Sequence, residues 1–514
     1  MSSSITDFLC DSSATVLETH SARVVLTATH AYKWKKPVDL GFLDFSTLEK
    51  RKAALENEYR LNQRLTEGVY EGVYPVYQTP EGLSWEDDGK AEVVEYVLRM
   101  QRLEESGFLH HRLREELPFP RRDLTRLAEV LAAFYATASG GHTHAYRTYG
   151  NPEALRKTLN EALELPETVN EYPALPTIRT FLKQFPDLHE ASLKSRAASG
   201  QIVDAHGDLH LDHVHFSAEG TINIYDCIEF NDRFRYIDWL NDVAFLFMDF
   251  DYHAHHAEGS YMRKQLLKQM NTTLTPEVRA LLSMYQAYRA VVRAKVALIR
   301  AESTTTTDTA LQKQTEAKRY LGLALRYATL GICRTWVVIS GGIATGKSTF
   351  SNALAEQWQC PAFHSDVVRK ELAGIGPKTP TPEARKAEVY SAAFTEKTYQ
   401  ALLDKAEVAS EREGMSILDA TFRQTGQLEK LIRRANQTHT RLVFLELTAD
   451  EEVVRERLRA REGKRTSSDA RLQEMQFVTY LSQEQEMKKH GRFLQLDTAR
   501  PLTENIRQVM SFLA

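Results

Sequence analysis

The stretch that decides the fold of the C-terminal part is Trp336-Val337-Val338-Ile339-Ser340-Gly341-Gly342-Ile343-Ala344-Thr345-Gly346-Lys347-Ser348. Its pattern predicts an apolar strand, then a turn that fits GxxxxGK[ST] over residues 341–348, then the start of a helix. In this order the glycines let backbone N–H groups close around phosphate oxygens, and the helix N-terminus adds partial positive charge. The stretch therefore predicts a phosphate-binding loop, or P-loop.

The loop predicts ATP and Mg²⁺ as cofactors. Lys347 is expected to reach the β- and γ-phosphates of ATP, and Ser348 is expected to place its hydroxyl on Mg²⁺. The full set of residues that we expect to bind the nucleotide is Gly341, Gly342, Ile343, Ala344, Thr345, Gly346, Lys347, Ser348 and Thr349.

Around this loop, from about Gly331 onward, apolar strands alternate with helical segments. The alternation is typical of a parallel sheet with crossover helices, and it predicts an α/β domain over residues 331–514. The expected strands are 336–340, 362–364, 416–418, 442–447 and 493–496.

Several polar residues follow these strands, at the edge of the sheet where phosphates are expected. Asp366 could orient or deprotonate a substrate hydroxyl, or it could cap the helix that begins there. Arg369 is expected to hold a substrate anion. Asp419 ends the next apolar strand and resembles a Walker-B acid, which holds Mg²⁺ through water.

A run of arginines lies farther on, at Arg455, Arg457, Arg459 and Arg461. Alternating positions cannot share one helical face, so part of the run faces solvent. Arg457 and Arg461 are four residues apart, and we expect them to offset charge on the transferring phosphate. Residues 334–514 thus resemble small-molecule P-loop kinases, near gluconate kinases and zeta-toxin-like kinases.

The first part of the chain predicts strands at 23–28, 31–35 and 91–99 and helices at 46–67 and 123–137. Helices are also expected over 150–200 and 238–330, with the polar run 303–309 as a loop. Between them, two short apolar strands are each followed by acids, in Ile202-Val203-Asp204-Ala205-His206-Gly207-Asp208 and in Thr221-Ile222-Asn223-Ile224-Tyr225-Asp226.

His206-Gly207-Asp208 resembles the catalytic loop H-G-D-x-x-x-x-N of aminoglycoside phosphotransferases, which share the protein-kinase-like fold. The resemblance implies an α+β domain in which Asp208 accepts or orients the substrate hydroxyl. It further implies that Asp226 binds the metal. Two acids at the ends of adjacent short strands would hold the nucleotide's metal between them.

The same resemblance extends to the N-terminal half. Lys33 resembles the strand lysine that pairs with ATP phosphates, and Glu58 resembles its ion-pair partner. Lys35 has the same side-chain direction as Lys33 on a strand and is the rival lysine. Glu95-Tyr96-Val97 would lie at the hinge where adenine docks.

One position departs from the family pattern, since His213 stands where the metal-binding Asn is expected. Mg²⁺ prefers hard oxygen ligands, whereas imidazole suits softer ions. Three outcomes are open: Asp212 shifts to bind the metal; His213 binds a different ion or simply packs; or the domain is a pseudokinase. His210 and His215 could extend a metal cluster, although such histidines are more often structural hydrogen-bonding groups.

Both halves together resemble a bacterial family in which an aminoglycoside phosphotransferase-like domain is fused to an AAA-type or zeta-toxin-like domain. The runs 35–45 and 228–231 carry this resemblance in particular. It implies a protein-kinase-like domain at 1–330, a P-loop domain at 331–514, and phosphotransfer to an unidentified acceptor.

Composition agrees with a soluble protein of two or three domains, with 514 residues, 42% hydrophobic residues and a net charge of -4. Nothing in this balance indicates a nucleic-acid or membrane-surface partner. Four scattered cysteines suggest no disulfide framework, and no signal-peptide or membrane-span pattern is present, so a cytoplasmic location is expected.

The leading hypothesis is a two-domain ATP-dependent kinase that transfers the γ-phosphate to a hydroxyl of a small molecule. One alternative is an ATP-switched regulatory protein whose first domain is a pseudokinase sensor. Another is a zeta-toxin-like nucleotide-sugar kinase. The sequence leaves the oligomeric state and both acceptors open.

Overall fold

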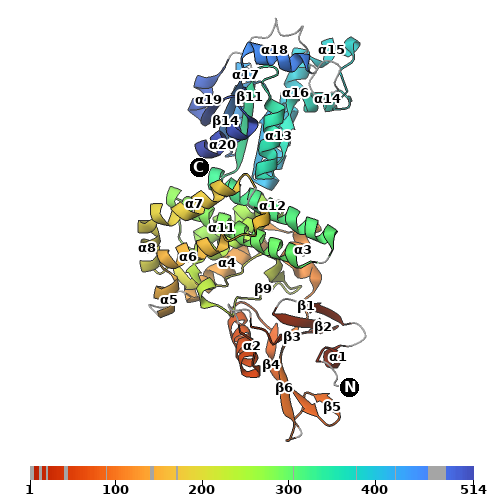
Figure 1. Ribbon diagram of the computed structural model, residues 1–514, viewed down its shortest axis with the longest axis vertical. Coiled ribbons are helices and arrows are strands. Elements are labelled where there is room, and N and C mark those ends of the chain that lie inside the picture. The colour runs from red at the N-terminus through yellow and green to blue at the C-terminus, as the bar shows by residue number, and fades with distance from the viewer. Residues whose placement is uncertain are drawn as a thin grey trace. The chain divides into compact units, whose positions relative to one another are not determined.

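The computed structural model describes residues 5–10, 14–18, 21–39, 44–87, 89–117, 119–138, 144–169, 172–304, 306–377, 379–422, 424–460 and 482–513. Its elements form two compact units (Figure 1). The first unit comprises residues 1–157, 189–249 and 260–274, and the second comprises 158–188, 250–259 and 275–514. A compact unit is not by itself an independently folding domain, so the expected domains 1–330 and 331–514 stay a prediction.

In the described part of the second unit, five strands form a sheet in the order β12-β13-β11-β14-β15. Every neighbouring pair is parallel, which confirms the predicted parallel sheet. The strand before the P-loop, β11, is central and buried along its whole length, as an apolar run in a parallel sheet should be. The strands are β11 (Thr335–Gly341), β12 (Ala362–His364), β13 (Met415–Asp419), β14 (Arg441–Thr448) and β15 (Arg492–Asp497).

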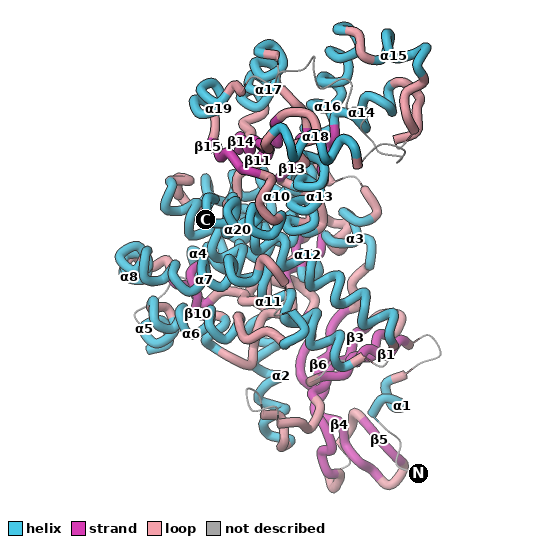
Figure 2. The backbone as a smooth tube through the Cα atoms, turned by 45° about the horizontal axis from the view of Figure 1, so that its top comes forward, coloured by secondary structure: helices cyan, strands magenta, loops and turns pink. Residues whose placement is uncertain are grey.

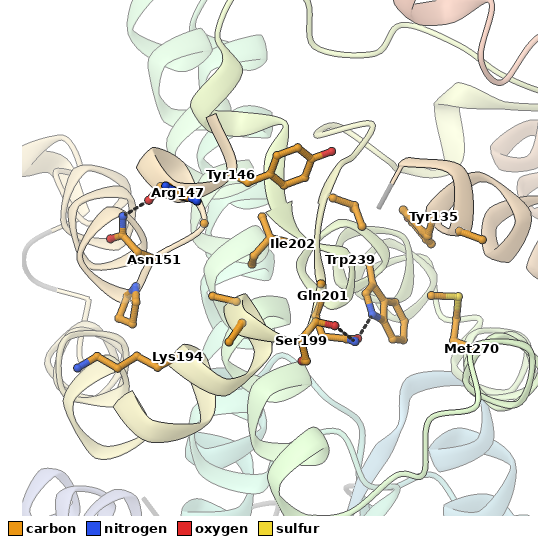
Figure 3. Close-up of a pocket in the computed structure, with 17 residues that line it drawn as sticks. Tyr135, Tyr146, Arg147, Asn151, Lys194, Ser199, Gln201, Ile202, Trp239 and Met270 are labelled. Carbon is orange, nitrogen blue, oxygen red and sulfur yellow. Dashed lines mark hydrogen bonds between the residues drawn. The ribbon is translucent and has the colours of Figure 1, made fainter. Parts of the chain in front are cut away.

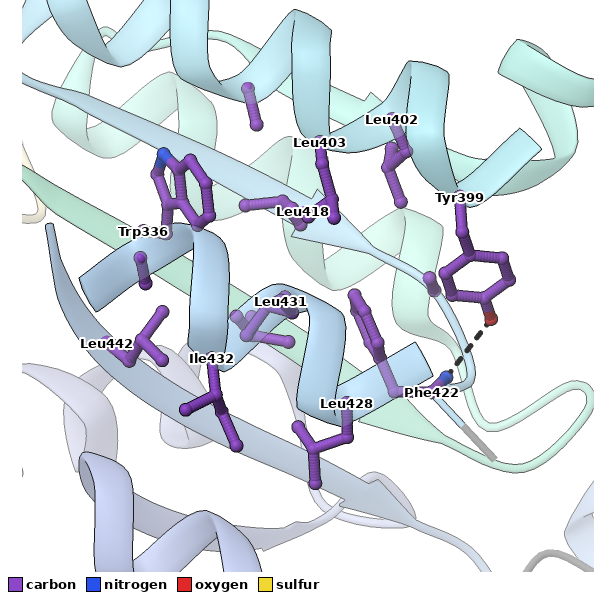
Figure 4. Packing of buried hydrophobic residues seen from close by; sticks show 14 of the residues in the cluster. Trp336, Tyr399, Leu402, Leu403, Leu418, Phe422, Leu428, Leu431, Ile432 and Leu442 are labelled. Carbon is purple, nitrogen blue, oxygen red and sulfur yellow. Dashed lines mark hydrogen bonds between the residues drawn. The ribbon is translucent and has the colours of Figure 1, made fainter. Parts of the chain in front are cut away.

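Crossover helices cover this sheet, and Figure 4 shows one of the cores between them. Trp336 of β11 and Leu418 of β13 pack there against Leu402 and Leu431 from two helices, all fully or almost fully buried. The Trp336 indole nitrogen donates to Ser410 Oγ at 2.9 Å, so its polar atom is satisfied. The helices are α13 (Lys347–Trp358), α14 (Ser365–Leu372), α15 (Glu383–Val389), α16 (Ala392–Glu413), α17 (Thr425–Gln437), α18 (Glu451–Arg459), α19 (Glu484–His490) and α20 (Leu502–Leu513).

The second unit also contains a group of helices that precede the sheet in the chain: α7 (Leu175–Leu188), α11 (Pro276–Ser303) and α12 (Thr307–Leu330). Helices α11 and α12 pack along each other, and α12 also packs against α13 and α20. The predicted loop 303–309 is shorter than expected, since α11 includes Ser303 and α12 begins at Thr307.

A buried polar network centres on Asp251 in this unit. Its carboxylate lies 2.8 Å from Arg326 Nη2 and 2.6 Å from His256 Nδ1, and it accepts a hydrogen bond from Tyr327. Burial would raise the pKa of Asp251, but the charges of His256 and Arg326 outweigh burial and hold the pKa below its ordinary value. The carboxylate is therefore a stabilising group whose contribution depends on its charge.

The Asp251→Asn protein is expected to lose about 2 kcal/mol of unfolding free energy near neutral pH, because the neutral amide leaves buried donors poorly paired. A carboxyl with a lowered folded-state pKa stabilises above its unfolded pKa of about 3.9, and that contribution disappears as the pH falls through the folded pKa. Urea unfolding of the native and Asp251→Asn proteins should therefore show a difference in unfolding free energy that shrinks in acid.

The control is Asp404→Asn, which removes an exposed ion pair with Arg434 and should cost less than about 1 kcal/mol. Equal losses in the two variants would contradict this role of Asp251.

In the described part of the first unit, six strands form an antiparallel sheet in the order β1-β2-β3-β6-β4-β5, drawn in magenta in Figure 2. Helix α2 (Leu48–Asn62) packs against β4 and β6. The expected strands and helix are confirmed, as is the α+β fold of this part. The strands are β1 (Thr15–Glu18), β2 (Ala22–Leu26), β3 (His30–Lys35), β4 (Tyr70–Thr79), β5 (Gly82–Ser84) and β6 (Glu92–Gln101).

The expected hinge position is wrong. Glu95, Tyr96 and Val97 lie inside β6, where they pair with Val76, Pro75 and Tyr74 of β4. The Glu95 side chain is also bound by Arg51 of α2, at 2.8 Å. On the other side of β6, the pairs with β3 begin only at Leu98, and the strand continues to Gln101. The chain leaves the sheet only after Gln101, so the connection to the helices begins at about Arg102.

The rest of the first unit is mainly helical, with two small antiparallel sheets. The two acid-bearing strands were expected to be adjacent, but β7 (Ile202–Asp204) pairs with β10 (Tyr236–Asp238), and β9 (Ile222–Ile224) pairs with β8 (Val214–Phe216). Helices that lie wholly in this unit include α1 (Ile5–Leu9), α3 (Leu109–Arg114), α4 (Arg121–Ala138), α5 (His144–Tyr149) and α8 (Glu190–Ala198). Three helices cross between the units along the chain: α6 (Pro152–Ala162), α9 (Trp239–Tyr252) and α10 (His256–Gln269).

None of the helices in the described residues combines the length and the apolar character needed to cross a membrane.

Candidate active sites

The first unit brings Lys33 of β3, Glu58 of α2 and Asp226 together. Lys33 Nζ lies 2.6 Å from Glu58 Oε1 and 2.9 Å from Asp226 Oδ1. Burial disfavours the charge of Lys33, but Asp226 and Glu58 outweigh it, so the Lys33 pKa is raised well above its ordinary value. The Lys33 ammonium therefore stays charged, as a lysine that contacts phosphate must.

The rival lysine, Lys35, shares the same glutamate. Lys35 Nζ lies 2.7 Å from Glu58 Oε2 and 2.6 Å from Glu229 Oε1. Its side chain is 3% exposed, against 15% for Lys33, so Lys33 is the lysine nearer to the surface. Lys35 instead ties α2 to the segment after Asp226, an arrangement that the sequence reasoning missed.

Asp226 has a strained backbone, with φ of 63° in the left-handed region. Non-glycine residues adopt this region at a cost of about 1–2 kcal/mol. Partial burial would raise the Asp226 pKa, but Lys33, followed by His213, lowers it. Such strain, together with a lowered pKa, is typical of residues that a fold aims at a functional site.

Asp208 lies on the same side of the fold as Asp226, and His213 stands between them. His213 Nδ1 is 3.8 Å from Asp208 Oδ2, and His213 Nε2 is 3.7 Å from Asp226 Oδ2. The Asp208 side chain is 38% exposed and so is open to a substrate hydroxyl. The structure thus brings together the predicted set Lys33, Glu58, Asp208, Asp226 and His213.

Asp242 of α9 supports the loop His206–Asp208, and its role was not predicted. Its carboxylate accepts hydrogen bonds from the backbone N–H groups of His206 at 3.1 Å and Gly207 at 2.8 Å. The Tyr135 hydroxyl donates to it at 2.8 Å. The only sequence signal is an acid in the first turn of an apolar helix, which does not reveal a contact 35 residues away.

Two alternatives for the metal position can be compared with the geometry. Asp212 lies 3.1 Å from His110 and 3.4 Å from His210, so its carboxylate is engaged with histidines. Asp208, His210 and His213 offer one ligand atom each within 4.8 Å of one another. His215 is engaged elsewhere, since its Nε2 donates to the Glu104 carbonyl at 3.0 Å.

The P-loop of the second unit has the backbone that its glycines predict. Gly341 adopts φ of 138°, and a Cβ there would lie 2.3 Å from the Leu447 carbonyl oxygen, so only glycine fits. Gly346 is left-handed at the start of α13, and Ala344 adopts φ of 58°. Lys347 Nζ curls over the loop and donates to the Gly342 carbonyl at 2.7 Å.

The predicted metal residues of this unit meet at the start of α13. Ser348 Oγ donates to Asp419 Oδ2 at 2.7 Å. His364, at the end of β12, also lies 2.7 Å from Asp419 Oδ2. The Ser348–Asp419 contact is the arrangement expected for a Walker-A hydroxyl beside a Walker-B acid. The role of His364 was not predicted, although its position directly before Asp366 at a strand end is a usable signal.

The predicted acceptor residues lie on α14, which β12 leads into. The helix cap is His364 rather than Asp366, so the capping alternative for Asp366 is wrong, and Asp366 lies in the first turn. Arg369 is 8% exposed and donates to the Val389 carbonyl at 2.9 Å and to Thr395 at 3.1 Å. These contacts account for Arg369 structurally, and its role toward substrate stays a prediction.

Of the two arginines expected over the phosphate, Arg457 lies at the loop. Its guanidinium donates to Thr498 Oγ1 at 2.9 Å and to the Thr498 carbonyl at 2.6 Å, with Ala344 O at 3.4 Å. Thr498 in turn donates to the Thr345 carbonyl at 2.8 Å. Arg461 lies outside the described residues.

A cavity of about 800 Å³ in the first unit was not predicted (Figure 3). It lies beside β7 and the start of α9, with Trp239 and Tyr146 facing it and Arg147 and Lys194 toward its outer side. Gln201 accepts from the Trp239 indole at 2.8 Å. Neither Asp208 nor Asp226 lines this cavity, so it is separate from the predicted catalytic residues.

Comparisons with known proteins match each half of the chain to a known family. The family model described as "Phosphotransferase enzyme family" matches residues 42–274, and the model described as "AAA domain" matches residues 337–483. A protein of Mycobacterium tuberculosis described as uncharacterized is 32% identical over 464 residues, covering 89% of this chain and 88% of that protein. A gluconokinase from Sinorhizobium meliloti 1021 is 24% identical and covers 35% of this chain and 91% of its own (TM-score 0.24). The GDP complex of aminoglycoside 2′-phosphotransferase-IIIa is 16% identical and covers 61% and 93% (TM-score 0.37).

Proposed function

Because this chain belongs to the two-domain family that joins a phosphotransferase-family domain to a P-loop kinase-like AAA domain, we propose that it is an ATP-dependent kinase with two nucleotide sites. Each site transfers the γ-phosphate of ATP to a hydroxyl of a small molecule. The observation that carries the proposal is that each unit gathers a lysine and a carboxylate from distant segments: Lys33 with Asp226, and Lys347 on the loop beside the Ser348–Asp419 pair.

The P-loop site has the donors of a magnesium–nucleotide site. Ser348 Oγ and Asp419 Oδ2 are oxygen atoms that lie 2.7 Å apart, and oxygen is the ligand type that Mg²⁺ prefers. When bound, Mg²⁺ would neutralise charge on the phosphates. Loop N–H groups would hold the phosphates, and Lys347 would turn from the loop carbonyls toward them. Asp366 would orient the acceptor hydroxyl, and Arg457 would face the transferring phosphate.

In the first-unit site, separate residues would likewise bind the phosphates, accept the proton and hold the metal. Lys33, held by Glu58, would bind phosphate oxygens. Asp208 would accept the proton of the acceptor hydroxyl, on a loop that Asp242 holds in place. Asp226 would supply a metal ligand, beside His213. The donor set here mixes one carboxylate with one imidazole, so it fits Mg²⁺ less well than the P-loop set does.

The imidazole of His213 also favours one alternative, in which the first unit binds nucleotide without transferring phosphate and acts as a sensor. That alternative keeps the P-loop site as the only catalytic centre. The two functions differ in whether phosphate reaches an acceptor at Asp208.

The proposal is tested by incubating the purified chain with γ-labelled ATP and a library of hydroxylated metabolites, followed by chromatography of labelled products. Transfer of label to an organic hydroxyl is expected. The Asp208→Ala and Lys347→Ala proteins then assign each product to a site. If neither substitution changes any turnover, the kinase proposal fails. If only Lys347→Ala does, the first unit is the sensor.

A further inference from the structure

His213 lies between two carboxylates of the first-unit site, those of Asp208 and Asp226. His213 is the last residue of a short 3₁₀ helix (Leu211–His213) that follows the catalytic loop. Its Nδ1 lies 2.9 Å from the backbone carbonyl oxygen of Asp208. A carbonyl oxygen only accepts hydrogen bonds, so Nδ1 must carry the proton. In the neutral ring this leaves Nε2 with its lone pair exposed toward whatever faces it.

The group that faces Nε2 is a carboxylate. His213 Nε2 lies 3.7 Å from Asp226 Oδ2, while Asp226 Oδ1 is held by Lys33. With Nδ1 as the donor to Asp208, the Nε2 lone pair of the neutral ring and a carboxylate oxygen lie on the two sides of one gap, where a single metal ion could bind both atoms.

The gap has the width that one metal ion spans. A metal–imidazole bond of about 2.1 Å and a metal–carboxylate bond of about 2.1 Å reach at most about 4.2 Å end to end. The observed 3.7 Å is within that span. Metal-bound histidines also commonly donate their other ring N–H to a backbone carbonyl, as His213 does to Asp208.

We propose that the first-unit site binds its nucleotide with a first-row transition ion, held by His213 Nε2 and Asp226, in preference to Mg²⁺. The inference rests on the proposed nucleotide binding at this site. Its chemical basis is that imidazole nitrogen suits first-row ions such as Fe²⁺, Ni²⁺ and Zn²⁺, whereas Mg²⁺ favours oxygen. Mn²⁺ is the first ion of the same affinity series and serves here as the paramagnetic probe. The P-loop site of the same chain, with Ser348 and Asp419, keeps an oxygen donor set.

The test is pulsed electron paramagnetic resonance of Mn²⁺ bound with ADP to the full chain carrying Lys347→Ala, which weakens nucleotide binding at the P-loop. Imidazole ¹⁴N modulation is expected, and it should change to the ¹⁵N pattern in protein grown with ¹⁵N-histidine. In the His213→Asn protein, the labelled and unlabelled samples should give the same spectrum. In the His210→Gln protein, the label should still change the imidazole modulation. The Mn²⁺ over Mg²⁺ preference in ADP binding should fall by about tenfold or more in His213→Asn.

Each contrary outcome identifies a different error. Bound ADP with no histidine modulation in the unsubstituted or labelled chain overturns the proposal, because the site then uses oxygen ligands alone. If the His210→Gln protein loses the histidine modulation and the His213→Asn protein keeps it, the ion is held by the cluster that contains Asp208 and His210, and the proposed ligand pair is wrong. No ADP binding with any ion, in a chain with an unchanged circular dichroism spectrum, contradicts the proposed function of the first unit itself. The labelled native chain keeps the test valid should His213→Asn fail to fold.

Discussion

A Lys347→Ala protein is expected to lose ATP turnover at the P-loop site by about 10²–10³-fold, because a positioned cation on the transferring phosphate contributes that much to catalysis. The structure holds Lys347 Nζ over the loop, 2.7 Å from Gly342 O and 3.1 Å from Gly341 O. Those carbonyls lie at the edge of the nest that would receive phosphate. A phosphate bound in this nest would therefore lie beside the Lys347 ammonium, and alanine removes that charge.

The measurement is release of labelled phosphate or product in an Asp208→Asn background, which silences the first unit. The matched control is Lys489→Ala, since Lys489 is a surface lysine of the same unit that pairs with Glu486 at 2.9 Å. The control should retain full turnover. Turnover in Lys347→Ala equal to that of the control would mean that the P-loop does not carry the activity.

An Asp208→Asn protein is expected to lose phosphotransfer at the first-unit site by about 10²–10⁴-fold, which is the usual contribution of a positioned general base. Asparagine keeps the shape of the side chain but cannot accept the proton of the acceptor hydroxyl. The loop itself should stay in place, because Asp242 holds the N–H groups of His206 and Gly207. The loss should therefore appear in kcat, with nucleotide affinity retained.

This prediction is checked with product formation and ADP binding in a Lys347→Ala background. Asp212→Asn provides the control, because Asp212 is an acid of the same segment whose carboxylate faces His110 and His210. Asp212→Asn is expected to remain active. A larger loss in Asp212→Asn than in Asp208→Asn would show that Asp212 has the role assigned to Asp208.

Some of the fold followed directly from local pattern. The turn at 341–348 lies between an apolar strand and a helix. The positive φ values of Gly341 and Gly346 fall on the two glycines of the motif, whereas that of Ala344 falls on a variable position. The five apolar runs of the C-terminal part became the five described strands of one parallel sheet. By contrast, β4 was not predicted, since Gly72 and Pro75 interrupt its alternation and mask a strand that its partner β6 stabilises.

Part of the P-loop site was also predicted from the sequence pattern, because residues at the ends of neighbouring parallel strands lie close together. Ser348 and Asp419 were expected at one edge of the sheet because parallel strands end there together, and they are hydrogen bonded. The family resemblance, and not the pattern, led us to expect Glu58 as the partner of Lys33, and the two form an ion pair. The roles of all these residues toward nucleotide and acceptor stay predictions until the experiments above are done.

The sequence by itself determined the P-loop and the parallel sheet around it, because these depend on a short motif and on local periodicity. The kinase-like character of the first unit, with its lysine and acids, was expected from the family resemblance. Only the tertiary structure decided which lysine lies nearer the surface, that Glu229 pairs with Lys35 across 194 residues, and that His213 turns its Nε2 toward Asp226. Such contacts join segments that no local pattern relates. Their geometry is set by the packing of whole helices and strands, which fixes direction and distance only once the chain is folded.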